Sequence, residues 1–138
     1  MKPLILLHEA DKLRLDSLLN HHLPPPFPSP VAHAALEDIL SSAKIVRDPA
    51  LVEYHVGLFD EVTLVSPSDS RDYFKLAIVM PHKADVDSDL ISISMPISLA
   101  VFGKKSGDLV RWETPYGTRE MRIVALKKHE QLPALATA

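Results

Sequence analysis

Residues 90–126, LISISMPISLAVFGKKSGDLVRWETPYGTREMRIVAL, decide the fold of this chain. LISIS at 90–94 alternates apolar and polar residues, which predicts a half-buried strand. PISLAVFG at 96–103 begins with proline and ends with glycine, which predicts one or two helical turns that stop at Gly103. DLVRWE at 108–113 and REMRIVALKK at 119–128 predict two more strands, joined by the turn TPYGT. The lone tryptophan, Trp112, lies in the first of these strands and is interpreted as a core residue.

Two further strands are predicted immediately upstream. EVTLVS at 61–66 alternates, and YFKLAIVM at 73–80 has the composition of a buried strand. The segment between them, SPSDSRD, is dense in turn-forming residues. These two strands therefore form a predicted hairpin, and the sequence as a whole predicts an α+β fold.

The N-terminal part shows helical periodicity instead. Residues 4–7 are apolar and predict a short extended lead-in; from about Glu9 the pattern has period 3.6 until Pro24. Ser29-Pro30 predicts the cap and first turn of a second helix. The predicted inner faces consist of leucine and isoleucine positions: Leu15, Leu18, Leu19, Leu36, Ile39 and Leu40.

Neither helix, at roughly 12–14 residues, buries its apolar stripe alone, so we predict an antiparallel helical hairpin with a small satellite core. The hairpin forms an arm over residues 1–50, and the remainder, 51–138, forms the second domain. The proline-rich stretch HHLPPPFPSP at 21–30 lies at the tip of this arm. The predicted tip residues are His21, His22, Pro25 and Phe27.

Composition limits the possible classes of protein. The chain has 138 residues, of which 46% are hydrophobic and 24% charged, as in a soluble domain with a real core. It has no cysteine, which excludes a disulfide framework and thiol catalysis. No apolar run approaches the roughly 20 residues that cross a bilayer, and the start lacks the features of a signal peptide. We therefore expect a cytoplasmic protein that does not interact with membranes.

Charge is unevenly distributed along the chain. The net charge of −3 argues against a dedicated nucleic-acid binder, and we expect no sequence-specific contact with nucleic acid. Residues 51–89 hold three Lys/Arg against eight Asp/Glu, whereas residues 90–138 hold seven against four. Solvated faces are the simplest interpretation of both segments.

The motifs that would indicate catalysis, metal or phosphate binding are incomplete. DVDSD at 85–89 begins like a calcium loop, but Leu90 and Pro96 stand where glycine and glutamate are needed. GKKSGD at 103–108 lacks the ending of a phosphate-binding loop, and the adjacent His21 and His22 do not share a helix face. We therefore predict no catalytic residue, no metal and no cofactor.

Residues 90–126 resemble the C-terminal domain of the Gre transcript-cleavage factors. That family shows a strand ending in Ser-x-Pro, a short apolar helix, a Gly-Lys-x-x-Gly-Asp-like loop and two strands around a Pro-x-Gly turn. The matching residues are Ser94, Pro96, Ala100, Gly103, Lys104, Gly107, Asp108, Pro115 and Gly117. The resemblance covers roughly residues 55–129 and implies an FKBP-like antiparallel β half-barrel with one short helix.

The short arm indicates a particular branch of this family. Gre factors carry a long helical hairpin whose acidic tip helps to hold a catalytic Mg²⁺ in the secondary channel of RNA polymerase. This chain has room for a hairpin about half as long, and no carboxylate lies between His21 and Pro30. The short hairpin and the opening PLILLHEADKLRLDSLL resemble the Rnk group, the regulators of nucleoside diphosphate kinase. The lack of a tip carboxylate implies that binding is retained and cleavage is lost.

The resemblance implies a non-enzymatic regulator that binds RNA polymerase and competes with Gre-type cleavage factors. The implied docking segment runs from Ser94 to Phe102, and we expect Ile97 or Leu99 to be exposed within it. The full set of predicted partner-binding residues is Ser94, Met95, Pro96, Ile97, Leu99, Ala100 and Lys104. A Gre-like cleavage factor and an FKBP-like prolyl isomerase or chaperone are the alternatives, while oligomeric state and any effect on nucleoside diphosphate kinase stay open.

Overall fold

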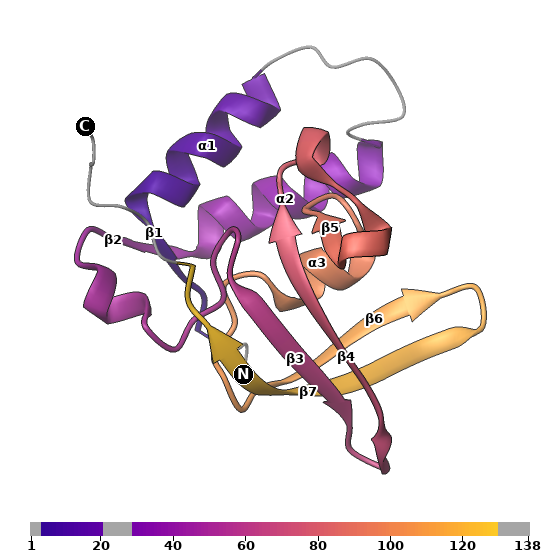
Figure 1. The fold of residues 1–138 in the computed structure, drawn as a ribbon. Coiled ribbons are helices and arrows are strands. Elements are labelled where there is room, and N and C mark those ends of the chain that lie inside the picture. Colours follow the sequence, from indigo (N-terminus) through magenta and orange to yellow (C-terminus); the bar gives the residue numbers. More distant parts are fainter. Residues whose placement is uncertain (1–3, 21–28, 130–138) are drawn as a thin grey trace.

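The computed structural model of the chain describes residues 4–20 and 29–129. The N-terminal part contains β1 (Leu6–His8), α1 (Glu9–Asn20), α2 (Pro30–Ser42) and β2 (Lys44–Val46). The two helices lie on one side of a curled five-stranded half-barrel sheet, which gives a mixed α+β fold (Figure 1). Within the described residues, none of the helices has the length and apolar character needed to span a membrane.

Both N-terminal helices form where the sequence predicts them. Helix α2 begins as expected, because the Ser29 Oγ accepts a hydrogen bond from the Ala32 amide at 3.1 Å and Pro30 occupies the first turn. The helix ends where Ala43 turns to an extended conformation, with ψ of 148°. The tip residues predicted between the helices, His21, His22, Pro25 and Phe27, lie outside the described residues.

A parallel strand pair, β1 with β2, closes the base of the helical segment. Leu6, Leu7 and His8 pair with Lys44, Ile45 and Val46, so the predicted lead-in at 4–7 is a strand shifted by two residues. Strand β2 was not predicted, because three residues are too few to show a period of two. An ion pair between Glu9 and Arg47, at 2.9 Å, lies beside this strand pair.

The main sheet contains β3 (Glu61–Ser66), β4 (Asp69–Val79), β5 (Leu90–Ser92), β6 (Leu109–Thr114) and β7 (Gly117–Lys127). Their order is β5-β4-β3-β7-β6. Neighbouring strands are antiparallel except β4 and β5, which are parallel, so the prediction of a wholly antiparallel half-barrel is wrong for this pair. The connection between them forms two 3₁₀ turns, η2 (Pro81–Lys83) and η3 (Val86–Ser88), and returns the chain in the original direction instead of forming a hairpin.

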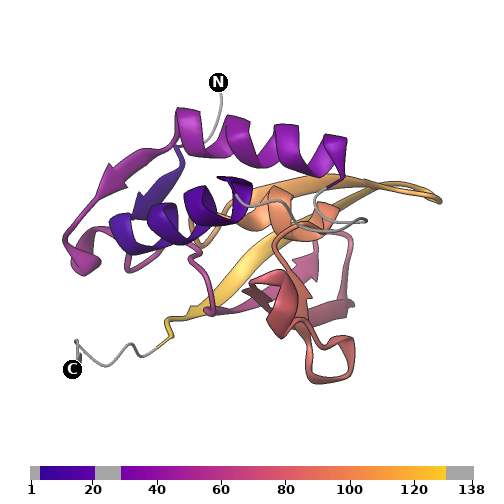
Figure 2. The same cartoon turned by 90° about the horizontal axis from the view of Figure 1, so that it is seen from above.

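One hydrophobic core joins the helices to the sheet. The short helix α3 (Pro96–Val101) lies between α2 and the concave side of the sheet (Figures 1 and 2). Leu15, Leu36 and Ile39 belong to the same buried cluster as Leu64 and Ile123 of the sheet. The predicted satellite core is therefore wrong, because the leucines of α1 and α2 pack toward the body and not only on each other.

The two helices are inclined to one another in the view of Figure 1. A polar groove lies between them, lined by Lys12, Asp16, His33 and Glu37 among others. Lys12 pairs with Asp16 at 2.5 Å, and His33 lies 3.3 Å from Glu37. The apolar contacts of each helix are consequently concentrated on the side that faces α3 and the sheet.

Candidate functional site

The corner between β5 and α3 is held by hydrogen bonds among the serines that precede the helix. The Ser92 and Ser94 hydroxyl oxygens are 2.8 Å apart, and the Ser94 amide donates to the Ser92 hydroxyl at 3.2 Å. The Met95 amide donates to the Ser92 carbonyl at 3.0 Å. Pro96 then fixes the first helical residue. These contacts give residues 92–96 little freedom to lose when a partner binds.

The exposed apolar residue of this corner differs from the predicted one. Met95 exposes 48% of its surface and Pro96 is also exposed, whereas Ile97 and Leu99 are only partly exposed and pack against the core. The expectation of an exposed Ile97 or Leu99 is therefore wrong. The reason is that α3 is covered by α2 on one side and by the sheet on the other.

Lys104 is engaged by the protein itself. Its Nζ donates to the Ala100 carbonyl at 2.8 Å, which caps the end of α3. Burial lowers the pKa of Lys104, and the nearby Asp108 carboxylate partly opposes this shift. The neighbouring Lys105 side chain is exposed, so it is the lysine of this loop that is accessible to a partner.

The hydroxyl of Ser98 is buried in α3, and no other described residue forms a hydrogen bond with it. Because a buried polar group without a partner costs roughly 1–3 kcal/mol, Ser98→Ala should raise the free energy of unfolding by about 1 kcal/mol. Urea unfolding of the two proteins measures this difference. Ser92→Ala is the matched control, because it removes a hydroxyl that does form hydrogen bonds and should lower stability. Equal losses for both variants would contradict the prediction.

A second cluster joins α1 to the β-sheet, and it was not predicted from the sequence. Asp11 exposes 5% of its surface and accepts a hydrogen bond from the Leu58 amide at 3.1 Å. Asp60 accepts from the Gly57 amide at 2.7 Å and from the Lys128 ammonium at 2.5 Å. We call Asp11, Asp60 and Lys128 the joint cluster, since it connects the first helix, the loop before β3 and the end of β7.

Burial raises the pKa of Asp11 above its ordinary value of 3.8, although the Leu58 hydrogen bond and Arg14 oppose the shift. A carboxyl whose folded-state pKa is raised stabilises the fold in its protonated form. This contribution is lost as the pH rises through the raised pKa. The joint cluster therefore holds one carboxyl, Asp11, that is costly to ionise and another, Asp60, that is paired with Lys128.

A cleft of about 550 Å³ lies beside the joint cluster. Its walls come from β1, Asp11 of α1, residues 49–60 and the two residues that follow β7. Leu7, Val56 and Leu58 contribute apolar surface, and Asp11 and Lys128 contribute charge. Within residues 4–20 and 29–129, no group of three histidine, aspartate or glutamate side chains is arranged to hold a metal ion.

Comparison with known proteins places this half-barrel and its corner in a family. The family described as "Transcription elongation factor, GreA/GreB, C-term" matches residues 53–128. The transcription elongation factor GreA of Brucella canis is 34% identical over 92 residues, which are 67% of this chain and 58% of that protein. A GreA/GreB structure from Nitrosomonas europaea aligns over 92% of this chain and 100% of its own, with TM-score 0.74 and 29% identity.

A weaker structural likeness concerns the fold alone. Thermus aquaticus Gfh1 aligns over 92% of this chain and 100% of its own, with TM-score 0.51 and 23% identity. The family match covers more than half of the residues, and the chain therefore belongs to the GreA/GreB family of transcription elongation factors. It spans 58% of the length of the curated GreA relative that it matches.

Proposed function

We propose that this protein is a non-enzymatic, cytoplasmic transcription regulator of the Rnk type. It binds RNA polymerase near the secondary channel and competes there with Gre-type cleavage factors. The observation that carries the proposal is the small reach of the N-terminal helices. Helices α1 and α2 have 12 and 13 residues, hence lengths of about 18 and 20 Å. Part of each helix packs in the core shared with the sheet, because Leu15 and Leu36 are fully buried there. That part of the helix does not extend toward a partner.

The charges of the helical segment support binding without cleavage. Metal-assisted hydrolysis of a phosphodiester needs oxygen ligands for the metal. No carboxylate lies between His21 and Pro30, and the nearest on either side already have partners. Asp16 pairs with Lys12, and Glu37 lies beside His33. A protein of this kind occupies the site of a cleavage factor without supplying the carboxylates.

In this proposal the half-barrel is FKBP-like in shape and serves as a docking module. The corner at Ser94, Met95 and Pro96, together with the start of α3, contacts the polymerase. The corner is pre-ordered by its hydrogen bonds, and Met95 offers an exposed apolar side chain. Lys105 supplies positive charge at the rim of the contact.

Competition on purified RNA polymerase tests the proposal. A labelled Gre-type cleavage factor should be displaced by increasing concentrations of this protein, and backtracked complexes should show no transcript shortening. Absence of displacement at saturating concentration contradicts the proposed binding. The Gre-like cleavage factor is the second candidate, favoured by the relatives named GreA, and transcript shortening by the protein supports it.

Met95→Asp should weaken binding to RNA polymerase by about tenfold or more, because it places a charge in an apolar contact at the proposed docking corner. Val86→Asp is the matched control, since Val86 is an exposed apolar residue of η3, which precedes β5, whereas the corner follows β5. Both variants should melt close to the wild-type temperature, as neither side chain is part of the core. Equal binding by the two variants would show that the corner is not the docking site.

A further inference from the structure

The open face of the sheet carries a row of four residues, one from each of four neighbouring strands. In the register of the sheet, Val65 of β3 lies opposite Tyr73 of β4 and opposite Arg122 of β7. Arg122 in turn lies opposite Leu109 of β6. We call Tyr73, Val65, Arg122 and Leu109 the cross-strand row. At about 4.8 Å per strand, it extends for roughly 14 Å across the sheet.

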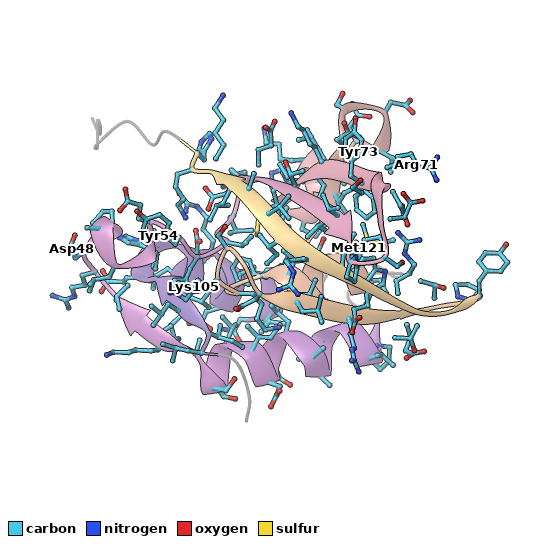
Figure 3. All side chains as sticks on the ribbon, turned by 90° about the horizontal axis from the view of Figure 1, so that it is seen from below. Asp48, Tyr54, Arg71, Tyr73, Lys105 and Met121 are labelled. Atoms are coloured by element: carbon cyan, nitrogen blue, oxygen red, sulfur yellow. The ribbon has the colours of Figure 1, made fainter. Side chains whose placement is uncertain are left out.

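Alternation along the strands places this row on the side away from the core. Leu64, Met121 and Ile123 are fully buried, so their neighbours Val65 and Arg122 point to the opposite face. The helices α1, α2 and α3 all lie on the core side of the sheet (Figures 1 and 2). Figure 3, seen from below, shows Tyr73 and Arg71 at the β4 side of the sheet, away from α2.

The row has an unusual composition for a solvated face. The open face of an antiparallel sheet is ordinarily polar. Here Tyr73 exposes 60% of its surface and Leu109 exposes 38%, and the partly exposed Val65 and the exposed Arg122 lie between them. Tyrosine and arginine are the residues most often found at the centres of protein interfaces.

Two positive charges, Arg122 in the row and Lys75 next to it, have no carboxylate partner within the described part of the chain. The Arg122 Nη1 donates to the Gly107 carbonyl at 2.9 Å, which ties the guanidinium to the loop before β6, and Arg122 forms no ion pair with another described residue. Lys75, two residues along β4 from Tyr73, is exposed and forms no ion pair within these residues. The neighbouring Arg111, by contrast, is paired with Glu120 at 2.5 Å.

We infer that the cross-strand row is a second contact surface for RNA polymerase, and that it receives an acidic protein segment. A carboxylate of that segment pairs with Arg122 and Lys75, and apolar side chains of the segment pack on Tyr73, Val65 and Leu109. The inference rests on the proposed function, to which it adds the chemistry of a second contact. Two aliphatic members of the row and the net charge of −3 favour a protein segment over single-stranded RNA.

Binding to core RNA polymerase free of nucleic acid tests this surface. Arg122→Glu and Lys75→Glu should each weaken binding by about tenfold, and the dependence of affinity on salt should decrease. Lys83→Glu is the matched control, because Lys83 is an exposed cation of η2, outside the row. Lys75→Glu should fold normally, because the Lys75 side chain forms no ion pair with another described residue. A loss of binding in this variant therefore reports the contact and not misfolding.

The outcomes separate the two proposals. Failure of the wild-type chain to bind core polymerase overturns the proposed function, and the second contact with it. Wild-type binding with unchanged affinity in Arg122→Glu and Lys75→Glu overturns only the second contact. The two variants are also tested for binding to a short single-stranded RNA. If they bind this RNA more weakly than the wild type but bind core polymerase equally well, the second contact is overturned and the row is assigned to nucleic acid.

Discussion

Gly103→Ala should lower the free energy of unfolding by roughly 2–5 kcal/mol, as measured by urea unfolding. Gly103 has φ of +79°, a left-handed conformation that alanine adopts at a cost of about 1–2 kcal/mol. A Cβ at this position would also lie 2.4 Å from the Ile5 Cγ2 atom, far inside normal contact. Relief of that overlap requires movement of the segment leading into β1, and overpacking of this kind costs about 1–3 kcal/mol.

The hydrogen bonds at Gly103 explain why the segment cannot move freely. The Leu6 amide and the His55 Nδ1 both donate to the Gly103 carbonyl, at 3.3 and 3.0 Å. The Gly103 amide donates to the Val56 carbonyl at 2.8 Å. Three segments distant in sequence therefore meet at this glycine.

Gly107→Ala is the matched control for Gly103→Ala. Gly107 also has positive φ, at +100°, but nothing lies within 4 Å of an added Cβ. It should therefore lose only the conformational part, about 1–2 kcal/mol. Equal losses for the two variants would show that the contact with Ile5 contributes nothing.

The sheet could be predicted from sequence because its signals are local. EVTLVS forms β3 at residues 61–66 as predicted, and the helical turns after Pro96 form α3. Each of these elements shows its period or its terminating residues within a few positions. The turn between β3 and β4 is shorter than predicted, since β4 begins at Asp69. The exposed first residues of β4 are polar, as the residues of a loop are, so the sequence does not show where the turn ends and the strand begins.

The features that sequence missed depend on contacts between distant segments. The parallel pairing of β4 with β5 depends on how residues 80–89 fold, and no pattern in the sequence specifies it. The joint cluster brings together positions 11, 60 and 128, and each of these residues alone is compatible with a solvated surface. Asp11 lies in the first turn of α1, where an acidic side chain suits the helix dipole, and its burial depends on the loop that reaches it from residue 58.

The docking segment stays a prediction, because it rests on the family resemblance. The corner itself forms after β5, where the serines and the proline predict it. Which side chains are exposed depends on what covers α3, and that cover comes from α2, about sixty residues earlier in the chain. For this reason Met95 is the exposed apolar residue, while Ile97 and Leu99 pack against the core. Lys104 likewise appeared to be a free charge because its acceptor is a backbone carbonyl.

The joint cluster should be the most sensitive polar site of the molecule. Asp60 exposes only 2% of its surface, and its carboxylate accepts three hydrogen bonds, from the Gly57 amide, the His129 amide and the Lys128 ammonium. Removal of one partner from such a buried pair leaves the others desolvated and unpaired. Among its contacts with residues 4–20 and 29–129, Lys128 would keep the hydrogen bond to the His55 carbonyl, at 2.8 Å.

We therefore expect Asp60→Ala to lower the free energy of unfolding by about 3–5 kcal/mol in urea titrations near neutral pH. The matched control is Asp72→Ala, which removes an ion pair with Arg119 at 3.2 Å. The side chains of that pair are 39% and 42% exposed, far more than Asp60, so its loss should cost less than about 1 kcal/mol. A similar, small loss in both variants would show that solvent reaches Asp60 and that the joint cluster does not fix α1 to the sheet. A large loss confined to Asp60→Ala would mean that the stability of the fold depends on the bonds that join the loop before β3 to Lys128 and His129, the residues that follow β7.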